Sequence, residues 1–301
     1  MPHSERRRGI ALMVVAVAVF AVMDLCLKFL SAQLPPLEVA TLRSAASLPF
    51  VLASVGVRGR WQALKIRRVG LHILRGLLSV VMIATFSFAI GRMSISGVYT
   101  SYMVAPLLVT AVAVPALGER VRMDAWIAII VGFLGVLAVL RPGANGPLNF
   151  LGSLATLASA TCYALNYVLA RQIARTDSSE SLVFWVLLLM AVFSAALGFA
   201  GWQPVPASLW PAIAIIGVTG AIAQVCITRA FLMAPASVIA PFEYTALLWG
   251  GLFDWFIWGV RPTLVMLFGA ALIVGSGIYV MIANTATSAA EKLSAESEPH
   301  P

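Results

Sequence analysis

The 301-residue sequence predicts an all-α integral membrane protein whose ten transmembrane helices form two inverted five-helix repeats. The first observation is composition, since 61% of residues are hydrophobic and only 11% are charged, unlike an ordinary globular domain. The second is the length of the uncharged segments, because a spanning helix needs about 20 mostly apolar residues. No Asp, Glu, Lys or Arg occurs in 93–118, 142–170, 181–228 or 262–290. The third is an internal repeat.

Breaks at proline, glycine and charged residues divide the apolar sequence into spans. The first span follows Arg6, Arg7 and Arg8, but it is too long for the apolar region of a signal peptide and contains Asp24, so we expect a retained helix. A Pro/Gly cluster in 142–149 is a linker between the halves, which gives repeats at 9–141 and 150–283. The polar tail 284–301 is expected to be disordered. The ten spans are expected at 9–31, 37–56, 69–91, 95–117, 123–141, 150–171, 181–201, 209–230, 236–258 and 263–283.

The distribution of Lys and Arg predicts the orientation. If the N-terminus is cytoplasmic, fourteen of the twenty Lys and Arg residues flank the spans on that side and three flank them on the other. Cytoplasmic loops carry such an excess. We therefore expect a multi-pass protein of the inner membrane with both termini in the cytoplasm. The net charge of +8 is accordingly a topology signal, and no basic stripe interleaved with aromatic residues indicates nucleic-acid binding.

The internal repeat is visible as residue pairs at a nearly constant shift. A shift of 143 places 9–12 (GIAL) beside 152–155 (GSLA), and Lys28 beside Arg171. A shift of 140 places Met93 beside Met233. Because each copy has an odd number of spans, the second must enter the membrane in the opposite direction. Inverted repeats of this kind are typical of secondary transporters, which bind substrate near the midplane between the halves.

Several short segments in both halves have the pattern of a known family. They are 20–28 (FAVMDLCLK), 42–44 (LRS), 74–76 (LRG), 105–107 (APL), 117–121 (LGERV), 132–136 (GFLGV), 140–143 (LRPG), 240–244 (APFEY) and 269–273 (GAALI). On these segments the sequence resembles the drug/metabolite transporter superfamily, EamA type, over about 10–283, and is most similar to the branch with S-adenosylmethionine uptake and riboflavin transporters. This resemblance implies ten helices and transport of a small metabolite. One departure is Gly259-Val260, where the family often has Gly-Glu, as at Gly118-Glu119.

Four ionisable residues lie inside apolar spans at two matching depths. Asp24 and Arg43 fall in the outer half of the membrane, whereas Arg75 and Glu243 fall in the inner half, so each acid could meet a base at its own level. An intramembrane charge costs roughly 2.5–3.5 kcal/mol on insertion scales and usually faces a partner or a wet cavity. Each pair could be a static ion pair, or could bind substrate charge or a proton.

Polar and aromatic stripes favour a cavity with a few fixed polar groups, which suits a small organic ligand. Tyr99, Tyr102, Pro106 and Thr110 share one face of the fourth span, and Gly217, Gly220, Gln224 and Thr228 share one face of the eighth. Pro106 and Pro241 are expected to bend the fourth and ninth spans. The predicted substrate-binding residues are Asp24, Arg43, Arg75, Tyr99, Tyr102, Tyr163, Asn166, Tyr167, Gln224 and Glu243.

Other residues receive plainer interpretations. Lys28 is expected to extend toward the interface, and Asp254 to be an interfacial carboxylate. Cys26, Cys162 and Cys226 lie singly in three spans, so they indicate neither disulfides nor a metal site. Runs of small residues permit close helix contact within one chain or between two, which leaves a homodimer open. No cofactor is expected.

These observations favour a secondary transporter, proton-coupled or an exchanger, that moves a small organic metabolite such as an amino-acid-like compound, S-adenosylmethionine or riboflavin. An intramembrane enzyme acting on lipid-linked substrates would need a cluster of catalytic residues at one membrane face. No such cluster is visible in the sequence. A small-molecule-gated channel or receptor would show poorly saturating flux and no counterflow. The sequence has no Walker motif, so ATP is not expected to drive transport directly.

Overall fold

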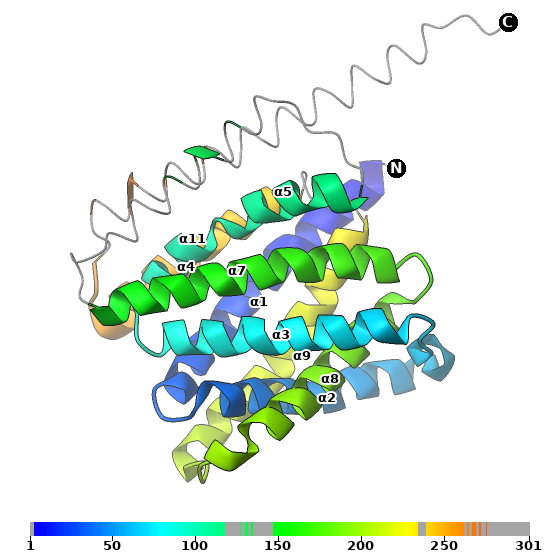
Figure 1. The fold of residues 1–301 in the computed structure, drawn as a ribbon, viewed down its shortest axis with the longest axis horizontal. Helices are drawn as coiled ribbons and strands as arrows, with labels where there is room; N and C mark the ends of the chain where they lie inside the picture. Colours follow the sequence, from blue (N-terminus) through cyan, green and yellow to red (C-terminus); the bar gives the residue numbers. More distant parts are fainter. Residues whose placement is uncertain are drawn as a thin grey trace, which may run out of the picture.

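The computed structural model describes residues 3–117, 147–233 and 239–261, with isolated positions at 127, 130–131, 134, 264, 267–268, 271 and 275. In this part of the chain every regular element is a helix (Figure 1), and six helices are long and apolar enough to cross a membrane. The predicted all-helical membrane class is therefore confirmed. The predicted spans 123–141 and 263–283, linker residues 142–146 and the tail 284–301 lie outside the continuous described ranges.

The six long helices follow the predicted spans with differences of a few residues at their ends. α7 begins at Pro147, three residues inside the predicted linker, because proline is tolerated in the first helical turn, where its missing N–H would have no partner. Short 3₁₀ turns at Trp61–Leu64 (η1), Phe199–Gly201 (η2) and Ala207–Leu209 (η3) stand in the connections. The long helices are α1 His3–Ser31, α2 Pro36–Val57, α3 Val69–Ile90, α7 Pro147–Ile173, α8 Ser179–Gly198 and α9 Trp210–Met233.

The fourth and ninth spans depart from a continuous α-helix beside the two prolines that were expected to bend them. The fourth divides into α4 (Ile95–Tyr102) and α5 (Ala105–Leu117), and in the ninth the 3₁₀ segment η4 (Ala240–Thr245) precedes α11 (Ala246–Trp258). Pro106 and Pro241 are the second residues of α5 and η4. A proline cannot donate the backbone hydrogen bond that a continuing helix needs. Tyr99 and Tyr102 thus belong to α4, whereas Pro106 and Thr110 belong to α5.

The helix packing has an approximate two-fold symmetry that follows the repeat. The most extensive contacts are α1 with α9, α3 with α7 and α2 with α8. If α1, α2 and α3 correspond to α7, α8 and α9, exchanging the copies converts the α1–α9 contact into the α7–α3 contact. The same exchange leaves the α2–α8 contact in place. The end of α3 meets the end of α1 at Gly91 and Ser31, and Met93 meets the start of α7 at Gly152, so α7 runs opposite to α1.

Two glycines allow close approach at symmetric contacts. A Cβ on Gly217 of α9 would lie 2.6 Å from the backbone oxygen of Ala46 in α2, and a Cβ on Gly76 of α3 would lie 2.6 Å from the Cβ of Leu189 in α8. The two glycines are 141 positions apart, within the range of shifts that relates the repeats. Small residues of this kind let membrane helices approach closely enough for their backbones to touch.

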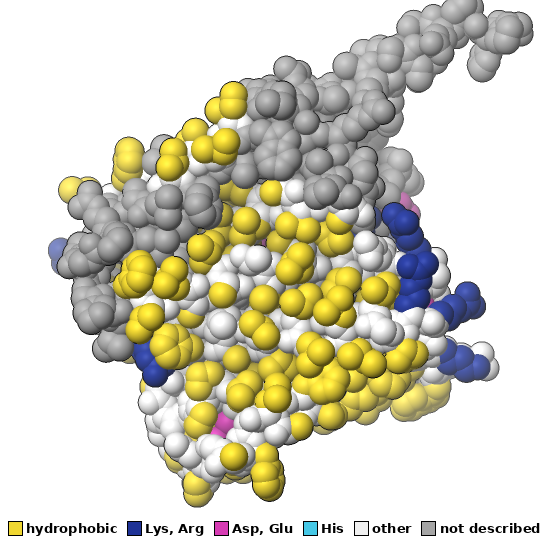
Figure 2. Space-filling view, viewed as in Figure 1, with side chains coloured by type: hydrophobic (Ala, Val, Ile, Leu, Met, Phe, Trp, Pro, Cys, Tyr) yellow, Lys and Arg dark blue, Asp and Glu magenta, His cyan; other side chains and the backbone are white. Residues whose placement is uncertain are grey.

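The surface has the pattern of a membrane protein. Figure 2 shows hydrophobic side chains across the middle of one face and Lys and Arg gathered at the right-hand end, where α1 begins. Arg58, Arg60, Lys65, Arg67 and Arg68 all lie in the α2–α3 connection at this end. We call it the arginine-rich end.

The Gly217 contact predicts a stability difference between two glycine substitutions. Gly217→Ala should lower the free energy of unfolding by about 1–3 kcal/mol, because the backbone of α2 must move away from the added methyl group. The measurement is thermal or denaturant-induced unfolding of the purified protein in detergent. Gly251→Ala in α11 is the matched control, since no described residue lies within 4 Å of its Cβ position. Equal effects of the two substitutions would contradict the packing argument.

Candidate functional site: a polar cavity inside the helix bundle

All ten predicted site residues line a single cavity of about 190 Å³. They come from α1, α2, α3, α4, α7, α9 and η4, so the cavity is built by both repeats. The four charged members are almost fully buried, with between 5% and 8% of each residue exposed. The structure therefore brings together the residues that depth and helical spacing singled out, and it does so around a hollow rather than in a packed core.

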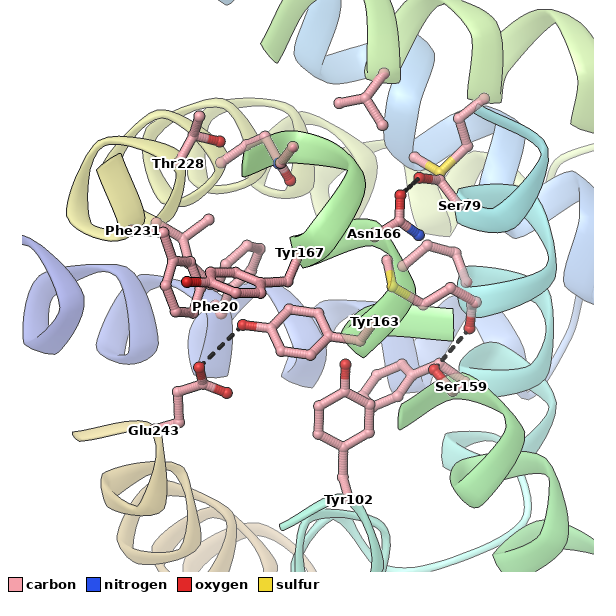
Figure 3. A pocket seen from close by; sticks show the side chains of 18 of the residues that line it. Phe20, Ser79, Tyr102, Ser159, Tyr163, Asn166, Tyr167, Thr228, Phe231 and Glu243 are labelled. Atoms are coloured by element: carbon pink, nitrogen blue, oxygen red, sulfur yellow. Dashed lines mark hydrogen bonds between the residues drawn. The ribbon is translucent and has the colours of Figure 1, made fainter. Parts of the chain in front are cut away.

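Each buried acid accepts a hydrogen bond from a tyrosine. The Tyr99 hydroxyl donates to Asp24 at 2.8 Å, and the Tyr163 hydroxyl donates to Glu243 at 3.0 Å (Figure 3). The first pair joins α1 to α4, and the second joins α7 to η4. These elements are counterparts in the two repeats, with the acid and the tyrosine exchanged. Each carboxyl group is thus held by a tyrosine hydroxyl, at places that the approximate two-fold symmetry relates.

The two expected ion pairs are not formed, which corrects the idea that each acid contacts the base at its own depth. Within the described residues, neither Asp24 with Arg43 nor Glu243 with Arg75 approaches within the 4.0 Å of a salt bridge. Arg75 donates to the backbone oxygen of Leu182 in α8 at 2.8 Å. Depth along a helix gives the level of a side chain and not its direction around the bundle, so matching depths did not ensure contact.

The arginines retain hydrogen-bonding capacity at the cavity. The Nε atoms of Arg43 and Arg75 are buried and have no hydrogen-bond partner among the described residues. Both side chains line the cavity. A guanidinium has five N–H donors in a planar fork that matches carboxylate and phosphate groups. A bound anionic group could therefore supply the acceptors that these arginines lack.

A ladder of aromatic rings forms one wall. Ring centroids are separated by 5.7 Å between Phe86 and Tyr102, 5.9 Å between Tyr102 and Tyr163, 6.5 Å between Tyr163 and Phe231, and 4.8 Å between Phe231 and Tyr167. All five rings line the cavity. Aromatic pairs prefer tilted and offset contacts over this range of separations. The wall offers an extended apolar surface that is interrupted by tyrosine hydroxyls.

Several residues that line the cavity were not predicted from the sequence. Ser79 donates to Asn166 at 3.2 Å, and Ser159 donates to the backbone oxygen of Met82 at 2.8 Å (Figure 3). Ser79 is one turn after Arg75 and Phe231 is two turns after Gln224, so helical spacing could have added both. Gln224 and Thr228 of the predicted stripe line the cavity.

The end of the bundle away from the arginine-rich end is tied together, and Asp254 is central to it. This carboxylate accepts from the backbone N–H groups of Ile95 and Ser96 at 3.0 and 2.6 Å and from the Ser96 hydroxyl at 2.5 Å. Asp254 is only 1% exposed, lies near the end of α11 and is not among the residues that line the central cavity. Lys28 extends toward this same end, where its Nζ donates to the Met93 oxygen at 2.6 Å.

A second acid organises the arginine-rich end. Asp177, in the α7–α8 connection, accepts from His72 at 3.0 Å, from the Arg67 backbone N–H at 3.1 Å and from the Thr176 hydroxyl at 2.8 Å. Burial alone would raise the pKa of Asp177, but these hydrogen bonds outweigh it and hold the pKa below its usual value. The carboxylate therefore stays ionised and ties the start of α3 to the loop before α8.

Comparison with known proteins identifies the family. The model of the EamA-like transporter family matches residues 7–141 and 150–282. This bundle of apolar helices with a polar interior belongs to the class of membrane transporters. The chain is a member of the EamA-like transporter family.

The relatives named in this comparison are transporters. The chain is 29% identical to a riboflavin transporter of Vibrio cholerae over 95% of this chain and 96% of the relative. It is 26% identical to the pseudopaline exporter CntI of Pseudomonas aeruginosa (95% and 98% covered), and 24% identical to an S-adenosylmethionine uptake transporter of Rickettsia prowazekii (91% and 92% covered). A solved crystal structure has the same fold, with a TM-score of 0.67, 20% identity and coverage of 92% of this chain and 98% of that chain.

The tyrosine–acid bond predicts unequal effects of two tyrosine substitutions. Tyr163→Phe removes the donor to Glu243, and we expect ligand affinity to change by about fivefold to 100-fold, since losing the partner of a buried polar group costs about 1–3 kcal/mol. The measurement is ligand-dependent thermal stabilisation of the purified protein. Tyr244→Phe is the control, because the Tyr244 hydroxyl is buried and has no hydrogen-bond partner among the described residues. An equal change in both variants would contradict a specific role for the Tyr163–Glu243 bond.

Proposed function

We propose that this protein is a secondary carrier for a small metabolite that combines a flat aromatic ring with a charged arm. The observation that carries the proposal is one cavity lined both by a row of aromatic rings and by two arginines that form no salt bridge with an acid among the described residues. In this proposal ten helices cross the inner membrane as two inverted repeats, with both termini in the cytoplasm. The ten predicted residues contact the substrate.

The wall favours a planar ligand. Rings that tilt against one another along Phe86, Tyr102, Tyr163 and Phe231 offer faces and edges to a flat heterocycle. The flavin ring of riboflavin and the adenine ring of S-adenosylmethionine both have this shape. The relatives that are named for these two compounds support a ring-bearing substrate for this chain.

The charges favour a zwitterionic arm. Arg43 and Arg75 are the proposed contacts for a carboxylate, and Asp24 and Glu243 are the proposed sites for an amine or for a coupling proton. Riboflavin lacks both a carboxylate and an amine, whereas the amino-acid arm of S-adenosylmethionine has both. The charge pattern therefore favours an amino-acid-bearing ring compound, with riboflavin as the second candidate.

The shape of the cavity supports an alternating-access mechanism. Its lining runs from mid-depth residues such as Asp24 to Arg171, Leu182 and Leu232, which lie near the helix ends at the arginine-rich end. At the other end Asp254 holds α11 against the start of α4. We assign this arrangement to the state in which substrate exchanges with the cytoplasm.

Counterflow in proteoliposomes tests the function. Vesicles loaded with unlabelled S-adenosylmethionine, riboflavin, amino acids or nucleosides are offered the labelled counterpart of each. Accelerated uptake of one compound would establish a carrier and name its substrate. Saturating uptake without counterflow stimulation would contradict the carrier mechanism, and uptake proportional to concentration would favour a channel. Chemical conversion of the compound would favour an enzyme.

Arg43→Gln tests the role of the cavity arginines. We expect uptake of a carboxylate-bearing substrate to fall at least tenfold, because a hydrogen bond between charged groups contributes about 1.5–3 kcal/mol. The matched control is Arg92→Gln, which removes the same charge from a residue that contacts the ring of Phe88 and does not line the cavity. Wild-type uptake by Arg43→Gln at normal expression would remove Arg43 from the site.

A further inference from the structure

A second cavity, of about 330 Å³, lies at the arginine-rich end between α2, α8 and α9. It shares no lining residue with the central cavity. Its lining combines three arginines and one glutamate with a series of apolar side chains. The lining residues that the argument uses are Arg58, Arg60, Glu180 and Arg229 at one end, and Phe50, Val218 and Ile222 at the other.

The polar end of this cavity has excess positive charge. Glu180 contacts Arg60 at 2.6 Å and Arg229 at 3.6 Å. The Glu180 carboxylate is thus shared by two arginines, and Arg58 adds a third positive charge to the same cavity. The lining therefore has two more positive than negative charges. An anionic group of one or two charges would complete the neutralisation.

The apolar end lies farther along the helices from the arginine-rich end, and its side chains are exposed at the surface of the bundle. Along α9, Ile222 and Val218 are seven and eleven residues before Arg229, which corresponds to about 10 and 16 Å at the helical rise. Phe50, Val218 and Ile222 are 45%, 40% and 46% exposed. These side chains belong to helices that we treat as membrane-spanning, so the exposed surface faces hydrocarbon. A cationic end and an apolar groove of this length match an amphiphile.

We propose that this cavity binds an anionic phospholipid, with its phosphate at Arg58 and Arg229 and an acyl chain against Phe50, Val218 and Ile222. Basic pockets between transmembrane helices are suited to anionic head groups. A soluble anion would use the arginines but would leave the exposed apolar groove unexplained. The proposal does not depend on which metabolite the carrier moves, because the two cavities are separate.

Native mass spectrometry of the full-length protein in detergent tests the proposal. The protein is offered equal amounts of phosphatidylglycerol and phosphatidylcholine with identical acyl chains, and the bound fractions are compared. We expect phosphatidylglycerol to be preferred, and the Arg58→Gln/Arg229→Gln double variant to bind it about 25-fold more weakly. Each basic residue near an anionic lipid contributes about fivefold, from roughly 1 kcal/mol.

Two further variants keep the result specific. Arg67→Gln/Arg68→Gln removes the same charge from the same end of the bundle at exposed positions outside the cavity, and should retain the preference. Val218→Trp narrows the groove and should weaken binding of both lipids without abolishing the preference for the anionic one. Melting temperatures of all variants verify that each is folded.

Three outcomes would overturn the proposal. Equal binding of the two lipids, or equal losses in the two double-arginine variants, would mean that the cavity does not recognise the head group. Full competition by glycerol 3-phosphate at the affinity of the lipid would assign the site to a soluble anion. A dimer that disappears only in Arg58→Gln/Arg229→Gln, without added lipid, would make this surface an interface between two copies.

Discussion

Polar groups in this protein must be satisfied without lipid, and that constraint organises the interior. A backbone break inside a membrane is tolerated only where protein or a water-filled cavity receives the freed groups. Both observed breaks obey this rule, since Met103 at the first and Ala246 at the second line the central cavity. The cavity is therefore the place where the helix breaks, the buried acids and the buried arginines come together.

The two repeats agree in architecture and differ in chemistry. The glycine contacts and the helix pairs follow the pseudo-symmetry closely, because packing depends on small residues at fixed positions. The acid–tyrosine pairs keep the same two elements but exchange the partners, so Asp24 on α1 corresponds in position to a tyrosine-bearing turn of α7. Arg43 and Arg75 are not related by the pseudo-symmetry in this way, since both belong to the first repeat, one to α2 and the other to α3. A symmetric scaffold thus encloses a cavity whose two sides differ chemically, and under the proposed function this difference would orient the substrate.

Much of this arrangement could be predicted from the sequence, for reasons that particular residues make clear. Hydropathy predicted the six long helices, and helical spacing with depth selected ten of the residues that line the cavity. Depth could not decide the direction in which Arg75 points, so its partner in α8 was missed. The burial of Asp254 could not be predicted, because it depends on Ser96 of α4, which lies 158 positions away in the chain. Hydrophobic periodicity does not show which segments far apart in the chain contact one another.

The packing also indicates which parts of a carrier of this design could move together. α1 packs on α9 and α3 packs on α7, so each tight pair contains one helix from each repeat. Gly217 joins α2 to the first pair, and Gly76 joins α8 to the second. Under the proposed alternating access, the moving bodies are then these two mixed bundles rather than the repeats, and the extensive α2–α8 contact is the surface along which they shift. Arg43 and Asp24 belong to one bundle and Arg75 and Tyr163 to the other. A substrate that bridges the two arginines would therefore be held across the boundary at which the bundles change their relative position.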